Sequence, residues 1–430
     1  MAHGDLLTPD ENGLMQITRE LLDAIAADHG PAFYLLDAQR FEENFSALVG
    51  AFRRHCPNTS IAYSYKTNYI PRFCRIVDRL GGYAEVVSIM EAELAARAGV
   101  DPRKVFFNGP FKEIGHIAAV LSGGGVVNAD SLDELRLILQ FAEANPDGEY
   151  RIGLRLNFDV GDGVLSRFGI DAWSEDFPAA REAIAAAPNL RMAGLHCHFA
   201  TRTLACWSAR TKGMLAVLDS CLDTLPAPLE FVSLGGGLYG SMPDEMKAQF
   251  PVPIPSFADY AEVAAKPFAE FFARRTVGKP PLLIIEPGTA LVADAMKFAA
   301  RVVSVKQVQG KAIATLAGST YNVNPTPNRK NVPIEVVPDP AATEPRRLFE
   351  DADFAGYTCI ESDYLYRGYT GEIARGDFVM FDDVGSYSVV MKPPFILPNV
   401  AIVECDAQTG RVDVIKRRET VDDLFATYRF

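Results

Sequence analysis

Eight short apolar runs, each followed by an amphipathic stretch, fill most of the first 300 residues of this chain. The runs are continuously apolar, as expected of parallel strands that are buried on both faces. A strand–helix pair repeated eight times predicts a (β/α)8 barrel, whereas an open doubly wound sheet would usually show fewer repeats. The expected strands span residues 60–65, 82–87, 104–108, 126–129, 150–157, 190–199, 229–234 and 282–286.

After about residue 300 the pattern changes. Short apolar runs separated by turns rich in Pro, Gly and Asn predict strands, and a helix is expected only at 421–428. These strands are expected at 302–308, 312–316, 333–337, 357–359, 377–381 and 400–405. We therefore predict an α/β chain with a barrel domain over 38–299. Residues 1–37 and 300–430 are predicted to form a β-rich domain that contributes to the active site.

Composition excludes several classes of protein. The chain has 42 Lys and Arg against 55 Asp and Glu, a net charge of −13, and its basic clusters are short and scattered. Such a chain repels nucleic-acid phosphates. No apolar run approaches the ~20 residues that span a bilayer, and no signal peptide is visible. Seven widely spaced cysteines without a CxxC pair indicate neither disulfides nor a metal cluster. We predict a cytoplasmic protein that binds neither nucleic acid, membrane nor metal.

Lys66 follows the first expected strand, in Tyr-Ser-Tyr-Lys-Thr-Asn-Tyr. The catalytic residues of barrels gather at such carboxyl ends of strands. A lysine that is desolvated there has a lowered pKa and becomes a nucleophile toward carbonyl carbon. The alternative is a lysine whose amine reaches water from the end of a strand.

Two further strands end in residues that suit an anionic or aromatic ligand. Gly235-Gly236-Gly237 follows the seventh strand, where barrels commonly bind phosphate through backbone N–H groups. The alternative is a plain glycine-rich turn. Glu286 follows a strongly apolar strand, so its carboxylate needs a partner. A protonated pyridine nitrogen or a neighbouring basic side chain would serve.

His196 and His198 flank Cys197 at the end of the sixth strand. With the two-residue period of an extended strand, both rings would point to one side and Cys197 to the other. One ring could stack on a flat aromatic ligand. A metal pair is conceivable, although no carboxylate motif accompanies it, and satisfied core histidines are equally possible.

Cys359 lies beyond the barrel, in Tyr-Thr-Cys-Ile-Glu-Ser-Asp. A core thiol is the default interpretation of any cysteine. Glu361 and Asp363, however, would raise the pKa of this thiol and favour a neutral proton donor. Gly385-Ser-Tyr387-Ser is a late turn that carries a phenol and says little alone.

Together these motifs resemble those of the fold-type III pyridoxal-phosphate-dependent decarboxylases. The branch is that of the diaminopimelate decarboxylases, with ornithine and arginine decarboxylases as cousins. The similarity runs from about Tyr34 to about Tyr387, and its specificity lies in the order of nine motifs. These motifs are Tyr-Ser-Tyr-Lys66-Thr-Asn, Glu-Val-Val-Ser88, Asn128-Ala-Asp-Ser, Ser166-Arg-Phe-Gly-Ile, Gly194-Leu-His-Cys-His198, Gly235-Gly-Gly, Glu286-Pro-Gly, Cys359 and Gly385-Ser-Tyr387.

The resemblance implies a role for each matching residue. Lys66 would hold pyridoxal 5'-phosphate as a Schiff base, His198 would stack on its ring, and Glu286 would pair with the ring nitrogen. Cys359 would protonate the carbanion carbon, and in this family it reaches the site from the second subunit of a homodimer. Asp363 would support the loop of Cys359. The phosphate would be bound by Thr201, Gly235, Gly236, Gly237, Gly288 and Tyr387.

The departures from the family concern the substrate. Thr289 stands where the family's Glu-Pro-Gly is followed by arginine, and Asn324 to Asn328 is the best match to its Arg-Pro-x-x-Tyr. In the family these residues hold the substrate's distal carboxylate, a contact that Thr or Asn cannot replace. The family's Cys-Glu-Ser-Gly-Asp is also altered here. Arg329, Lys330 and Arg367 could form a different anion clamp or be solvated loop charges. The residues expected at the substrate are Asn324, Glu361, Asp363 and Arg367.

The sequence therefore predicts a carboxy-lyase. The substrate amine displaces Lys66, CO₂ leaves Cα, and Cys359 supplies the proton. We expect the substrate to be an amino acid or amino-acid conjugate other than meso-diaminopimelate. An amino-acid racemase or epimerase on the same scaffold is the alternative, although such proteins typically place an arginine where Glu286 stands. A non-catalytic cofactor carrier is a third possibility, but small carriers lack a domain like that predicted over 300–430.

Overall fold

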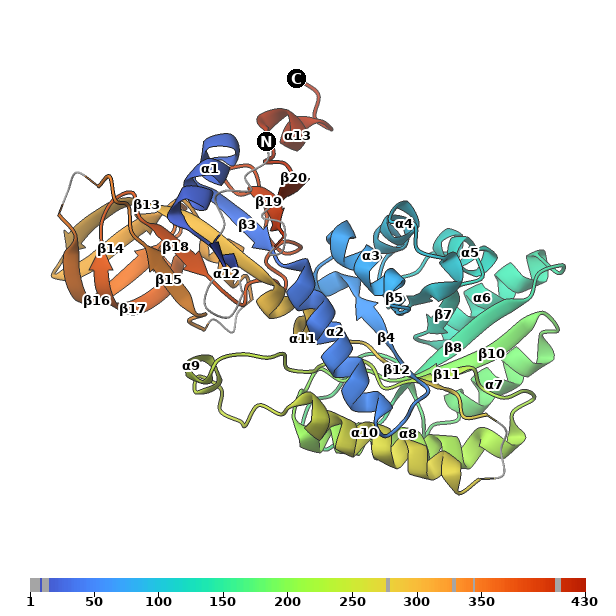
Figure 1. Ribbon diagram of the computed structural model, residues 1–430. Coiled ribbons are helices and arrows are strands. Elements are labelled where there is room, and N and C mark those ends of the chain that lie inside the picture. Colours follow the sequence, from blue (N-terminus) through green and yellow to red (C-terminus); the bar gives the residue numbers. More distant parts are fainter. Residues whose placement is uncertain (1–7, 10–14, 276–278, 327–329, 343–344, 407–410) are drawn as a thin grey trace. The chain divides into compact units, whose positions relative to one another are not determined.

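The computed structural model describes residues 8–9, 15–275, 279–326, 330–342, 345–406 and 411–430 (Figure 1). The chain divides into two compact units. One unit, which is β-rich, is formed by Met1–Phe41, Met242–Pro251 and Val292–Phe430. The other, which contains the barrel, is formed by Glu42–Ser241 and Val252–Leu291. Met242–Pro251 lies inside the sequence range expected for the barrel, yet it groups with the β-rich unit.

The barrel unit contains a closed ring of eight parallel strands, and each overlaps a strand predicted from the sequence. The last strand pairs with the first, with Leu283 opposite Thr59, and this pairing closes the ring. A short strand, β9 (Ile170–Asp171), extends β8 outside it. The ring consists of β4 (Thr59–Ser64), β5 (Tyr83–Val86), β6 (Val105–Phe107), β7 (Val126–Ala129), β8 (Tyr150–Asn157), β10 (Leu190–His196), β11 (Phe231–Ser233) and β12 (Leu282–Ile285).

Helices surround the barrel, and α8 and α10 lie side by side along it (Figure 1). Ser88, Ser131 and Thr203 begin three of these helices, each accepting a hydrogen bond from a backbone N–H of the first turn. Ser88, a motif residue, is thus a helix cap. The helices are α2 (Ala38–Arg53), α3 (Pro71–Arg79), α4 (Ile89–Arg97), α5 (Ile114–Ser122), α6 (Leu132–Ala144), α7 (Asp176–Ala186), α8 (Leu204–Cys221), α10 (Phe257–Ala273) and the short α11 (Thr289–Val292).

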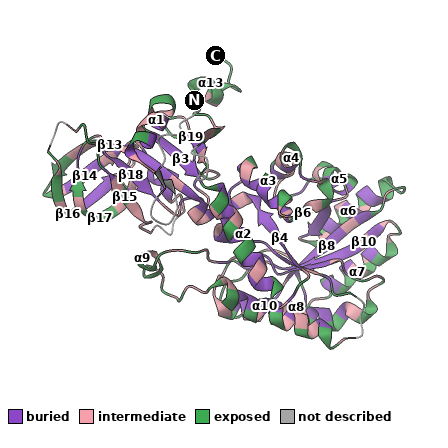
Figure 2. Ribbon diagram, in the orientation of Figure 1, coloured by how far each residue is buried: buried purple, intermediate pink, exposed green. Residues whose placement is uncertain are grey.

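Apolar side chains fill the interior of the barrel, whose strands are buried in Figure 2. Phe106 and Phe231 meet edge to face there, with their ring centres 4.8 Å apart. Gly194 leaves the space for this pair, because a Cβ at Gly194 would lie 2.5 Å from the Phe231 ring. The barrel is therefore a packed core, and a functional site has to lie at one of its two ends.

The β-rich unit is built on a sheet with the strand order β17-β16-β14-β13-β3-β19-β20, and β18 pairs with β13 and β15. Strand β3 (Ala32–Leu36), which precedes the barrel in sequence, pairs with β13 and β19. Helix α1 (Arg19–His29) packs its apolar face on this sheet. The other strands are β13 (Met296–Val308), β14 (Lys311–Leu316), β15 (Ile334–Val337), β16 (Arg347–Ala355), β17 (Tyr364–Ile373), β18 (Phe378–Phe381), β19 (Ala401–Cys405) and β20 (Val412–Lys416).

Short elements complete the described chain, and the three helices among them have fewer than six residues each. Among the described residues, no helix combines the length and apolarity that a bilayer span requires. The short elements are β1 (Thr8–Pro9), β2 (Met15–Gln16), α9 (Asp244–Lys247), α12 (Thr320–Val323) and α13 (Val421–Phe425).

The strand predicted at 357–359 is wrong, because these residues form a bend after β16. Asp363 accepts hydrogen bonds from the Thr358 N–H at 3.1 Å and from the Thr358 hydroxyl at 2.6 Å. These bonds fold the segment back on itself, so that its apolar residues do not join a sheet.

Candidate active site

Four of the predicted motifs lie at the carboxyl ends of four neighbouring barrel strands, β10, β11, β12 and β4. Lys66 is in a 3-10 turn after β4, and Glu286 directly follows β12. His198 and the triple glycine follow β10 and β11. Adjacent parallel strands bring their carboxyl ends together, so these residues share one end of the barrel.

Lys66 is half-buried and forms an ion pair with Glu85, a buried residue of β5. Its Nζ also lies 3.4 Å from the Ser64 hydroxyl. That hydroxyl donates to the Glu286 carbonyl at 3.1 Å, which links the first and last strands of the barrel. Sequence reasoning missed Glu85. The available signal was an acid inside the apolar strand next to the lysine.

Glu286 is buried and its carboxylate has three polar partners. Ser233 Oγ and Asn108 Nδ2 donate to Oε1 at 2.8 and 3.0 Å, and His196 Nε2 lies 3.1 Å from Oε2. Burial opposes ionisation, but His196 and Lys66 hold the pKa of Glu286 well below its ordinary value. A carboxylate offers about four acceptor positions, so this anion can still accept one further N–H, such as that of a pyridinium.

His196 and His198 have separate roles in the barrel end. His196 is buried against Glu286, whereas His198 is half-buried and accepts a hydrogen bond from the Gly236 N–H at its Nδ1, 2.9 Å away. Burial and the Lys66 ammonium lower the pKa of His198 well below its usual value. His198 is therefore a neutral ring of fixed orientation, which suits stacking on a flat ligand.

The glycine turn packs closely against its neighbours. A Cβ at Gly236 would lie 2.2 Å from the Glu286 carbonyl oxygen. Of the three N–H groups, that of Gly235 donates to Ser233 Oγ at 3.2 Å and that of Gly236 donates to His198. Within the described part of the chain, the Gly237 N–H has no partner. The turn therefore offers one free N–H to a phosphate, not the three expected from the sequence.

Arg210 of α8 is fully buried, and sequence reasoning missed it. Its guanidinium donates to the carbonyls of Leu234 and Gly236 at 3.2 and 2.6 Å, and to those of Phe199 and Thr201 at 2.8 and 3.0 Å. One arginine thus ties the loops after β10 and β11 together. It places Thr201, which is half-buried, beside the glycine turn.

The remaining predicted residues belong to the β-rich unit. Cys359 and Glu361 are exposed on one loop, whereas Asp363 is buried and bonds to that loop. Besides Thr358, its carboxylate accepts from Ser319 Oγ at 3.1 Å and from the Thr320 N–H at 2.7 Å. These contacts favour loop support over substrate binding for Asp363.

Asn324, Lys330 and Arg367 line a cavity of about 320 Å³ in the β-rich unit. Both cations already have partners: Lys330 donates to the Gln249 carbonyl at 2.8 Å, and Arg367 lies 3.4 Å from Asp353. Asn328 and Arg329 lie outside the described residues.

Tyr387 lies in a turn with a φ of 65°. Its phosphate contact, like the substrate contacts of Asn324 and Arg367, stays a prediction.

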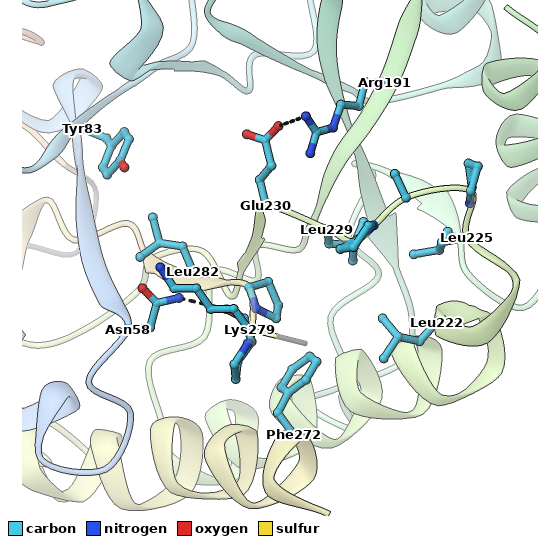
Figure 3. Close-up of a pocket in the computed structure, with 15 residues that line it drawn as sticks. Asn58, Tyr83, Arg191, Leu222, Leu225, Leu229, Glu230, Phe272, Lys279 and Leu282 are labelled. Carbon is cyan, nitrogen blue, oxygen red and sulfur yellow. Dashed lines mark hydrogen bonds and ion pairs between the residues drawn. The ribbon is translucent and has the colours of Figure 1, made fainter. Parts of the chain in front are cut away.

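A second hollow, of about 720 Å³, opens at the other end of the barrel (Figure 3). Glu230, which pairs with Arg191 at 3.4 Å, and Leu282 lie on its wall, at the amino ends of β11 and β12. In barrels this end carries stability and not catalysis. The candidate site is therefore the opposite end.

Residues 41–293 match the family described as pyridoxal-dependent decarboxylases, pyridoxal-binding domain. The chain belongs to this family. As a pyridoxal-dependent decarboxylase it is a carboxy-lyase that acts on an amino acid with pyridoxal 5'-phosphate. The donor set agrees, because an ion-paired lysine, a neutral flat histidine and a buried carboxylate with one free acceptor position meet at one end of the barrel.

Relatives cover nearly the whole decarboxylase chain. The diaminopimelate decarboxylase of Methanothermobacter thermautotrophicus is 27% identical, over 93% of this chain and 92% of its own. The L-glutamyl-[BtrI acyl-carrier protein] decarboxylase of Niallia circulans is 25% identical, over 96% of this chain and 97% of its own. The crystal structure of diaminopimelate decarboxylase from M. jannaschii shares the fold, with a TM-score of 0.82 at 23% identity, and covers 99% of this chain and 98% of its own.

Proposed function

We propose that this decarboxylase acts on an amino acid or amino-acid conjugate other than meso-diaminopimelate, with Lys66 as the residue that carries the cofactor. The observation that carries the proposal is the meeting of Lys66, Glu286 and His198 at the ends of adjacent strands. When bound, pyridoxal phosphate accepts the electron pair left on Cα as CO₂ departs.

The residues around Lys66 prepare it for this chemistry. Glu85 orients the ammonium group and is the base nearest to its proton. Glu286 supplies the negative charge that keeps a pyridine nitrogen protonated. His198 presents a neutral ring, so that it can cover the cofactor without adding positive charge.

Cys359 is proposed as the proton donor to Cα, contributed by the second subunit of a homodimer. Its exposure on the surface of the β-rich unit is consistent with such a role. Asp363 supports this assignment by holding the loop that carries the thiol, through hydrogen bonds at both of its oxygens.

Two observations favour a substrate other than meso-diaminopimelate. Thr289 and Asn324 do not supply the arginines that the resemblance implies at these two positions for the distal carboxylate of meso-diaminopimelate. The similarity to diaminopimelate decarboxylases is also hardly greater than that to the Niallia circulans enzyme, at 27% against 25% identity. The relatives reported above are named as decarboxylases, and no contact described above favours the racemase alternative.

Two measurements test the proposal. Purified protein should show the absorbance of bound pyridoxal phosphate, and Lys66→Ala should abolish it. Lys104→Ala is the matched control, since Lys104 pairs with Asp78 at 2.8 Å and precedes β6. CO₂ release should then be measured on a panel of acidic, basic and conjugated amino acids. An unchanged absorbance in Lys66→Ala, or meso-diaminopimelate as the best substrate, would contradict the proposal.

A further inference from the structure

Arg202 brings a guanidinium to the same end of the barrel as Lys66 and Glu286. It follows Thr201 in the loop after β10. Its Nη2 lies 3.5 Å from the hydroxyl of Thr289, just after β12. Its Cζ lies 5.4 Å from the ring centre of Tyr239, in the loop after β11. Three adjacent loops thus meet at this one side chain, which is half-buried.

The backbone of Arg202 is fixed on both sides. The Tyr260 hydroxyl donates to the Arg202 carbonyl at 2.6 Å, and burial raises the pKa of Tyr260 to about 12, so this donor keeps its proton. Arg210 holds the preceding carbonyl, and the following residue, Thr203, begins α8. The guanidinium is therefore presented from a rigid base, and little ordering is needed when it binds a ligand.

The charge of Arg202 is not neutralised. Over the described ranges, no Asp or Glu forms an ion pair with it, and its contacts are a hydroxyl and an aromatic face. Arg151 and Arg155 of the same unit, by contrast, have the acidic partners Glu230 and Asp130. A partly desolvated, unpaired guanidinium at a site mouth favours binding of an oxyanion, which it can hold with two hydrogen bonds.

We propose that Arg202 binds a carboxylate at the distal end of the substrate side chain, so that the substrates are α-amino acids with an acidic ω-group. This inference rests on the proposed decarboxylation. The contacts of Arg202 lie past the glycines of both turns, at Tyr239 beyond Gly237 and at Thr289 beyond Gly288. The guanidinium therefore contacts the residues that follow the two turns, at the same end of the barrel as Lys66.

The test compares each ω-acid with its ω-amide on the cofactor-loaded enzyme, over side chains from that of aspartate to that of 2-aminopimelate. Both members of a pair carry the same α-carboxylate, so only the distal charge differs. Arg202→Met should raise KM for the best ω-acid by about 10–100-fold, as expected for lost charged hydrogen bonds, and leave the amide unchanged. Arg202→Lys should recover part of the loss. Arg191→Met, at the opposite end of the barrel, is the control and should behave as wild type.

Three results would overturn the assignment. One is an equal rise of KM for acid and amide in Arg202→Met. Another is a weaker affinity for pyridoxal phosphate with the acid preference intact, which would assign Arg202 to the cofactor phosphate. The third is a wild-type preference for the amides.

A second measurement separates this inference from the proposed function. Glutarate, which has no amine to react, should raise the Tm of cofactor-loaded wild type and should not raise that of Arg202→Met. This binding is measured without turnover, so it supports Arg202 even if no amino acid on the panel releases CO₂. Equal protection of both proteins would overturn the assignment.

Discussion

At the scale of single residues, the candidate site depends on groups whose ionisation the fold has fixed. The buried Glu286 stays an anion because His196 and Lys66 lie close to it, although its surroundings are apolar. The half-buried His198 stays neutral because its surroundings and Lys66 disfavour a second positive charge. The negative charge of Glu286 and the neutral state of His198 are therefore set by the protein itself, before a ligand binds.

The neutral His198 predicts a pH dependence of stability. The pKa of His198 is lowered on folding, so below its unfolded value of about 6.5 the unfolded chain takes up a proton that the native chain does not. Stability should therefore fall as the pH drops from 7 to 5, by up to about 1.4 kcal/mol per pH unit from this residue. In cofactor-free protein, His198→Phe should show a flatter curve of Tm against pH. Parallel curves would contradict the lowered pKa.

Arg210 predicts a large effect from a residue that touches no reacting atom. Arg210→Met would leave the carbonyls of Leu234, Gly236, Phe199 and Thr201 without their donor. Unfolding of the barrel unit in urea should become easier by about 3 kcal/mol or more, and the affinity for pyridoxal phosphate should fall. Arg274→Met, at the exposed end of α10, should change stability by less than about 0.5 kcal/mol. Similar midpoints for both variants would exclude this role.

The sequence revealed residues with a local pattern and hid those defined by packing. Lys66 and Glu286 could be predicted because each follows an apolar strand. Arg210 could not, because its role arises only where α8 packs on two loops. Glu85 lay within an apolar strand, and its link to Lys66 depends on the pairing of β4 with β5.

At the scale of elements, continuous burial made the barrel strands predictable, whereas partial exposure hid others. All eight barrel strands were predicted because their runs are mostly apolar and largely buried. Strands β16 and β17 were missed because charged and exposed residues interrupt them, in Arg-Leu-Phe-Glu-Asp-Ala-Asp for example. The strand predicted at 357–359 was wrong because the apolar residues of this segment belong to a loop that Asp363 holds.

The loop that carries Cys359 should depend on both oxygens of Asp363. Asp363→Asn keeps the size of the side chain but replaces one acceptor by a donor, which conflicts with the N–H of either Thr320 or Thr358. Amide hydrogen exchange of the affected threonine should quicken by about 5–10-fold. Glu361→Gln, an exposed change on the same loop, should leave the exchange as in wild type. Unchanged exchange in Asp363→Asn would show that the loop holds its shape without this carboxylate.

At the scale of the whole molecule, a site shared between two subunits can be tested by mixing inactive variants. Lys66→Ala lacks the lysine proposed to carry the cofactor, and Cys359→Ala lacks the proposed proton donor. If the second subunit supplies Cys359, co-refolded mixtures should regain up to about a quarter of wild-type activity, because half of the dimers would contain one intact site of two. Each variant refolded alone is the control. No recovery from a mixture that does form mixed dimers would place both residues in one chain's site.

The closure of the barrel has a consequence for how this enzyme is made. Ser64 and Glu286 meet across 222 positions of sequence, and β12 takes its place beside β4 only after every other strand of the ring has been translated. A ribosome-bound chain that stops short of β12 would contain Lys66 but would lack Glu286, the acid proposed to pair with the nitrogen of the cofactor ring. Tight binding of the coenzyme should thus begin only when the eighth strand of the barrel has been added. The visible absorbance of the bound coenzyme would then report that synthesis of the barrel is complete.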